Sequence, residues 1–136
     1  MSKTIFRIGD LARLTGTKVV TIRYYESIGL MPPPERSAAN YRVYGQAQLD
    51  RLRFIRRCRD LGFALDQITE LAALSSDRQR CCDEVDTLTR THLAAVEEKI
   101  ADLNALADEL RRIGDQCHGG TTISDCRIID ALNHRP

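Results

Sequence analysis

The residues of this chain best suited to chemistry are its cysteines, because thiolates bind soft metal ions and form disulfides. The sequence holds five of them among 136 residues. Cys81 and Cys82 form an adjacent pair, and Cys117 and Cys126 bound the segment CHGGTTISDC. We therefore take Cys82, Cys117 and Cys126 as candidate metal ligands. Cys81 and the loop residue His118 are candidates for additional ligands.

A long helix is expected between the two groups of cysteines. Neither Gly nor Pro interrupts residues 83–113, so nothing local breaks a helix there. Apolar residues recur at steps of three and four along it: Leu93, Val96, Ile100, Leu103, Ala107 and Leu110. This spacing predicts the apolar seam of a coiled coil.

The length of that helix limits how the cysteines can meet. Cys82 and Cys117 are 35 positions apart, which is roughly 50 Å at the rise of an α-helix. A metal-bound thiolate sulfur lies only about 2.3 Å from its ion. If these residues share an ion, two chains must therefore supply them. An antiparallel pair of helices would bring Cys82 of one subunit to Cys117 and Cys126 of the other, with two equivalent sites per homodimer.

Composition indicates a small head attached to an extended helix rather than a large core, because the chain is short and has no Trp. Residues 1–62 carry 12 Lys and Arg against 5 Asp and Glu, a charge of +7, whereas residues 63–136 carry 8 against 14, a charge of −6. A basic first half favours contact with nucleic acid. No apolar run approaches the length of a membrane span and no signal peptide is evident, so we expect a cytoplasmic protein without membrane contact.

The basic half has the pattern of a winged helix-turn-helix domain. Residues 7–14 and 18–28 have helical spacing on either side of Thr15-Gly16-Thr17, and Thr17 is positioned to cap the second helix. The segment RSAANYRVY at 36–44 then predicts a small hairpin, or wing. Residues 47–61 predict a helix with five exposed Arg and with Cys58 as a packing residue. A short helix at 65–74 follows it.

We expect a mainly α-helical protein with four parts. Residues 1–74 would form the winged helix-turn-helix DNA-binding domain, 75–82 a linker, 83–113 the dimerisation helix of an antiparallel coiled coil, and 114–136 a metal-binding loop with a short helix that starts at Cys126.

The strings TIRYYE, IGL, NYRVY and LRFIRRCRDLGF, in this order, resemble the MerR family of transcriptional regulators, and with the long helix the resemblance covers nearly the whole chain. It is closest to the branch that senses divalent metals. The resemblance implies a homodimer that binds double-stranded promoter DNA between the −35 and −10 elements, and no enzymatic activity or catalytic residue. The metal-bound dimer would distort the DNA so that RNA polymerase engages both elements. The resemblance also implies DNA contacts by residues of the second helix and of the wing: Lys18, Thr21, Arg23, Tyr24, Arg36, Asn40, Tyr41 and Arg42. We add Arg56 from the arginine-rich helix. Tyr25 and Tyr44 are expected to be packing residues.

Thiolate ligands restrict the metal to soft or borderline ions. Cys82 favours a divalent ion, because copper(I) sensors of the family have Ser at this position and bind the ion with the two loop cysteines alone. We rank mercury, lead and cadmium together, then zinc, then copper(I), although SDCRIID resembles the tail of copper sensors.

One alternative is a redox sensor that switches by a disulfide between Cys117 and Cys126. A thiol-dependent enzyme is a second alternative, but the chain has no Cys-x-x-Cys or nucleotide-binding motif.

Overall fold

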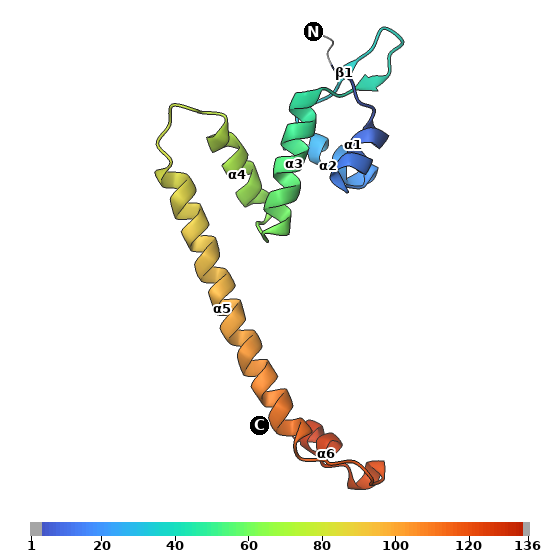
Figure 1. The fold of residues 1–136 in the computed structure, drawn as a ribbon, viewed down its shortest axis with the longest axis vertical. Coiled ribbons are helices and arrows are strands. Elements are labelled where there is room, and N and C mark those ends of the chain that lie inside the picture. The colour runs from blue at the N-terminus through green and yellow to red at the C-terminus, as the bar shows by residue number, and fades with distance from the viewer. Residues whose placement is uncertain (1–3, 135–136) are drawn as a thin grey trace. The chain divides into compact units, whose positions relative to one another are not determined.

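The computed structural model describes residues 4–134, and helices dominate it (Figure 1). Two compact units divide the chain: one comprises the residues up to Leu88, and the other begins at Thr89. The first unit contains a helical core with a two-stranded wing. The second contains most of a long helix and the short C-terminal elements.

The first unit opens with the helix-turn-helix. Helix α1 (Ile8–Thr15) ends at Gly16, which has a φ of 67°, and helix α2 (Val19–Ser27) follows directly. A left-handed residue at this point favours glycine, because a side chain there would be strained. The prediction that Thr17 caps α2 is wrong, since Lys18 occupies the N-cap position. Thr17 is buried and still belongs to the turn, where its N–H donates to the carbonyl of Ala12 at 3.2 Å.

The wing has the predicted form, with strands shorter than the hairpin pattern suggests. Strand β1 (Glu35–Arg36) pairs antiparallel with β2 (Arg42–Val43). At the tip Asn40 has a φ of 65°, a conformation that Asn tolerates better than most side chains. Tyr44 extends the pairing through two backbone hydrogen bonds with Phe6, of 2.7 and 2.9 Å. No local sequence pattern indicates this bridge, which connects the wing to the segment before α1.

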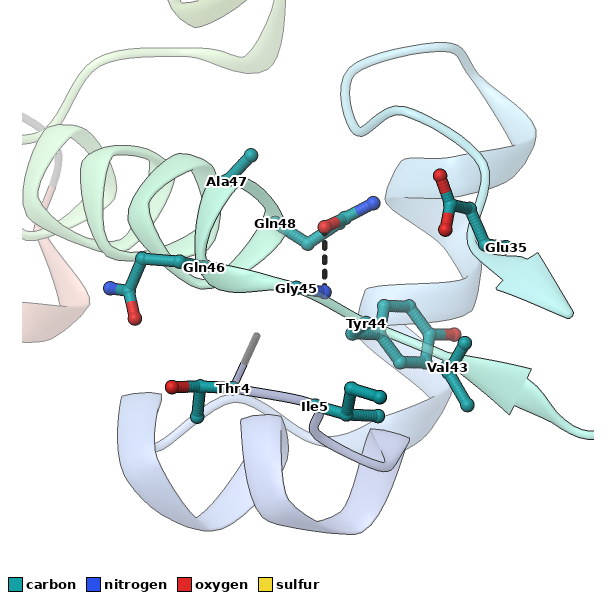
Figure 2. A pocket seen from close by; sticks show the side chains of 9 residues that line it. All are labelled: Thr4, Ile5, Glu35, Val43, Tyr44, Gly45, Gln46, Ala47 and Gln48. Carbon is teal, nitrogen blue, oxygen red and sulfur yellow. Dashed lines mark hydrogen bonds between the residues drawn. The ribbon is translucent and has the colours of Figure 1, made fainter. Parts of the chain in front are cut away.

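Helices α3 (Gln46–Asp60) and α4 (Leu65–Ser75) complete the core of this unit. Gly45 caps α3, and its N–H donates to the side-chain oxygen of Gln48 at 2.8 Å (Figure 2). The expected packing residues lie inside. Fully or almost fully buried positions include Leu11, Ile22, Tyr25, Tyr44, Leu49, Leu52, Ile55, Cys58 and Ile68. Burial also raises the pKa of the Cys58 thiol, which favours its neutral form.

The long helix α5 runs without a break from Asp83 to Gly114, one residue beyond the predicted end. Its first apolar residues, Val85 and Leu88, pack against the core of the first unit. The predicted seam is largely uncovered in this single chain: Ala107 is half-buried, but the other five residues, Leu93, Val96, Ile100, Leu103 and Leu110, are exposed, as is the adjacent Leu106. A helix this long with an exposed apolar stripe indicates a missing packing partner.

The second unit ends in a 3-10 turn, η1 (Ile123–Asp125), and helix α6 (Arg127–Asn133). The predicted start of this helix at Cys126 is off by one residue, because Cys126 has an extended backbone and is its N-cap. Residues 135–136 of the predicted C-terminal segment lie outside the described residues. None of the helices described is long and apolar enough to cross a membrane.

Candidate DNA-binding surface and metal-ligand residues

The second helix of the helix-turn-helix displays the four residues expected to meet DNA. Lys18 is exposed at the N-cap of α2. Within the helix Arg23 and Tyr24 are exposed and Thr21 is half-buried. Their neighbours Ile22 and Tyr25 point into the core, which fixes the orientation of the helix. The arrangement separates a packing face from a polar face, as a recognition helix requires.

Part of that polar face meets the arginine-rich helix. Lys18, Thr21 and Arg56 line one shallow cleft of about 320 Å³, together with Arg59. Arg56 is held there by two interactions: its Nη1 donates to the carbonyl of Gly16 at 3.3 Å, and its Nε lies 3.4 Å from an oxygen of Asp60. Three cations around the turn between α1 and α2 make a surface suited to a phosphate.

The remaining candidates gather between α2 and the wing. Arg23, Arg36, Asn40, Tyr41 and Arg42 line a second cleft, of about 310 Å³. The Nη1 of Arg36 donates to the carbonyl of Asn40 at 3.2 Å, which stiffens the hairpin. Tyr24 alone among the nine predicted residues lines neither cleft, although it is exposed on the same helix.

Sequence reasoning missed three residues of this surface. The guanidinium of Arg7 lies over the ring of Tyr41, 5.2 Å from its centre, and Arg7 lines the wing cleft. Arg59 lines the other cleft. Glu26 lies on α2, where its carboxylate accepts a hydrogen bond from the Tyr44 hydroxyl at 2.6 Å. Of the three, only Arg59 carried a sequence signal, as one of the five arginines of its helix.

A further cavity, of about 550 Å³, opens beside the wing between the N-terminal segment and the start of α3 (Figure 2). Ile5, Val43 and Ala47 supply its apolar wall, and Glu35 and Gln48 supply polar groups. It contains no cysteine or histidine and none of the predicted site residues.

Towards the C-terminus, the loop between Cys117 and Cys126 brings these two residues close to each other at the start of α6. Gly119 and Gly120 have φ values of 81° and 79°, left-handed conformations that only glycine adopts readily. The nearby backbone N–H groups of Ile129 and Ile128 lower the pKa of Cys126, and the neighbouring Cys117 side chain adds to the effect. The two thiols are therefore neighbours, and one is prepared to ionise. Both features suit a soft metal ion.

The other candidate ligands are not part of this arrangement. Cys81 and Cys82 are exposed just before α5, and the loop residue His118 is exposed as well. Across residues 4–134, no three His, Cys, Asp or Glu side chains come together as a group that could hold a metal ion. Because α5 is a continuous helix of 32 residues, it is roughly 48 Å long. Cys82 precedes it and Cys117 follows it.

Comparison with known proteins agrees with this reading. The family model for the MerR helix-turn-helix regulatory protein matches residues 6–74, and the model for the MerR DNA-binding region matches residues 49–113. The transcriptional regulator HmrR of Sinorhizobium medicae is 42% identical over 125 residues, which are 92% of this chain and 84% of that protein.

Two solved structures extend the similarity to three dimensions. The transcription regulator PbrR691 from Ralstonia metallidurans, in complex with lead(II), has a TM-score of 0.81 and 40% identity, over 93% of this chain and 98% of that one. MerR from Bacillus megaterium, in complex with mercury(II), has a TM-score of 0.74 and 34% identity, over 95% and 100%. The chain belongs to the MerR family of metal-responsive transcriptional regulators.

Proposed function

We propose that this protein is a homodimer that binds promoter DNA and activates transcription when a soft divalent metal occupies a site shared between subunits. Cys117 and Cys126 of one subunit would hold the ion together with Cys82 of the partner subunit. Cys81 and His118 remain candidates for additional ligands.

One observation carries the proposal: Cys117 and Cys126 lie close together, but no third ligand joins them in the described part of the chain. Two thiolates leave a divalent ion with open positions. The nearest unused cysteine in sequence, Cys82, is separated from Cys117 by the full length of α5. An antiparallel partner helix removes that separation, because it places the start of one α5 beside the end of the other.

The exposed seam of α5 supports such a partner. Leu103 is 64% exposed and Leu110 is 67% exposed in the single chain. Burial of a leucine side chain contributes roughly 1.5–3 kcal/mol, so a row of six apolar residues would stabilise a dimer strongly. The spacing is that of helices packing along their length.

The donor set supports a mercury, lead or cadmium ion first, and then zinc. Three thiolates and no oxygen ligand favour soft ions. Two similar proteins of known structure hold lead(II) and mercury(II), which agrees with this order. Copper(I) ranks last, because a two-thiolate site would leave Cys82 without a role.

The DNA-binding unit would act by positioning. Arginines of the wing and of α3 would contact phosphates, and the exposed residues of α2 would reach base edges. Metal binding would change how the two subunits hold the DNA. The DNA between the −35 and −10 elements would then be bent and untwisted, and RNA polymerase could engage both elements.

The proposal is tested by a competition between Hg(II), Pb(II), Cd(II), Zn(II) and Cu(I) for the purified dimer. The readout is transcription from a promoter duplex selected by the protein from a random-sequence pool. We expect Hg(II), Pb(II) or Cd(II) to activate at the lowest free concentration. Activation by Cu(I) alone would contradict the three-thiolate site.

A second candidate function, redox sensing, is favoured by the contact between Cys117 and Cys126. Thiols this close can form a disulfide. Treatment of the metal-free dimer with peroxide distinguishes the two functions. Activation by peroxide, with no response to any of the five metals, would establish the redox sensor instead.

A further inference from the structure

We propose that Glu26 and Tyr44 are positioning residues that lock the wing onto the recognition helix and so hold Arg42 where it can contact a DNA phosphate. The inference rests on the proposed function, because it assumes that Arg42 is a DNA contact. It assigns to both residues a positioning role rather than a DNA contact.

The lock is a hydrogen bond between two elements far apart in sequence. The hydroxyl of Tyr44, directly after β2, donates to Oε1 of Glu26 on α2 at 2.6 Å across 18 positions. Tyr44 is 1% exposed, and its backbone is fixed on the other side by the bridge to Phe6. A hydrogen bond from a buried hydroxyl to a carboxylate is strong, because one partner is charged.

The other carboxylate oxygen faces the wing. Oε2 of Glu26 lies 4.0 Å from Nη1 of Arg42, and the Glu26 side chain is only 12% exposed. Glu26 and Arg42 also line a cleft of about 500 Å³ together with Arg23 and Arg36. A single carboxylate thus accepts a hydrogen bond from one tyrosine hydroxyl, lies near Arg42 and shares a cleft with two further arginines.

This placement distinguishes two possible roles for Glu26. A negative charge in a cationic DNA-binding surface repels phosphate, so its removal should strengthen binding if charge alone matters. If Glu26 instead fixes the geometry of Arg42, its removal should weaken binding. Without Glu26 the Arg42 side chain is more mobile and loses more conformational entropy when it binds a phosphate. The two roles predict effects of opposite sign.

The inference is tested with Glu26→Gln, Tyr44→Phe and Arg42→Ala, each as the full-length dimer. Affinity for the selected duplex is measured by fluorescence anisotropy at several salt concentrations. Glu26→Gln keeps an acceptor for the Tyr44 hydroxyl but removes the charge beside Arg42. Tyr44→Phe removes the hydrogen bond but keeps the ring. Glu70→Gln, at an exposed position of α4, is the control for loss of a charge.

We expect Glu26→Gln and Tyr44→Phe each to weaken binding roughly three- to tenfold, as loss of an oriented charged contact does. Arg42→Ala should reduce the slope of log affinity against log salt by about 1, the value for one phosphate contact. The double variant Tyr44→Phe/Arg42→Ala should bind no more weakly than Arg42→Ala, because both changes remove the same contact. Glu70→Gln should stay within about twofold of wild type.

Two results would overturn the inference in different ways. If Arg42→Ala weakens binding while Tyr44→Phe only lowers the melting temperature, or while Glu26→Gln strengthens binding, the lock does not position Arg42 and the proposed DNA contact still stands. If Arg42→Ala leaves both the affinity and the salt slope unchanged, the wing contact of the proposed function fails, and the positioning role fails with it.

Discussion

Cys117 and Cys126 lie close together at the two ends of the loop, and the neighbouring Cys117 side chain helps to lower the pKa of Cys126. Cys126 is also the N-cap residue of α6, and the nearby backbone N–H groups of Ile129 and Ile128 lower the pKa of its thiol. The loop thus presents two soft ligands, and the proposed site needs a third from outside the chain. Its geometry follows from two left-handed glycines, Gly119 and Gly120.

Replacing any one of Cys82, Cys117 and Cys126 by Ser should abolish metal-induced transcription and leave operator binding largely intact. A serine oxygen is a hard, weakly acidic ligand and does not replace a thiolate toward a soft ion. Transcription at increasing metal concentration, together with gel-shift affinity, measures both effects. Cys81→Ser is the matched comparison for Cys82→Ser. A variant that still responds at wild-type metal concentrations would exclude its cysteine from the site.

The seam of α5 should hold the dimer together. Leu103→Asn puts an amide into the proposed interface and should destabilise the dimer by roughly 2 kcal/mol for each buried leucine. The fold of each subunit should be unaffected, since Leu103 is exposed in the single chain. Sedimentation equilibrium measures the dimer dissociation constant. Asp102→Asn, one position away and outside the seam, should leave that constant unchanged; equal effects of both changes would argue against the interface.

The recognition helix should carry part of the operator affinity. Arg23→Ala should weaken operator binding by about 1–3 kcal/mol if Arg23 meets a base edge, and should not change metal affinity. Arg23 is exposed on α2 and lines the wing cleft. A gel shift and a metal titration of the same preparation separate the two effects. An unchanged gel-shift affinity would remove Arg23 from the interface.

Tyr44 should give the protein a distinct response to alkaline pH. Burial and the hydrogen bond to Glu26 raise the pKa of Tyr44 from 10.0 to about 12. A pKa raised by folding adds stability that is fully present below pH 10 and is lost as the pH rises through about 12. Tyr44→Phe removes this contribution. The difference in free energy of unfolding between wild type and Tyr44→Phe should therefore shrink above pH 10, measured by urea denaturation; a constant difference would contradict the assigned pKa.

The sequence predicted the helices and the wing because their signals are local. Steps of three and four marked α5 to within one residue, and Gly16 marked the turn between α1 and α2. The errors and omissions depend on contacts between distant residues. Thr17 has the chemistry of a cap, but its N–H is used to close α1. The Phe6–Tyr44 bridge and the Glu26–Tyr44 hydrogen bond join segments whose proximity no local pattern encodes.

The sequence alone predicts only part of the candidate metal site, and the structure of a single chain shows only another part. The cysteine types and the helix between them pointed to a site shared by two chains. The structure added the contact between Cys117 and Cys126, because the loop conformation depends on Gly119 and Gly120 and on the 3-10 turn η1. The third ligand is a property of the proposed dimer, which a single chain does not contain.

Mixed dimers test the central claim most directly. One subunit carries Cys82→Ser and the other carries both Cys117→Ser and Cys126→Ser, and the heterodimer is purified with two different tags. A site shared between subunits predicts that all three substitutions fall in one pocket, which loses its three thiolates, while the other pocket keeps all three. Titration with Hg(II) should therefore find one tight site per heterodimer and two per wild-type dimer. Two intact sites in the heterodimer, or none, would contradict the shared site.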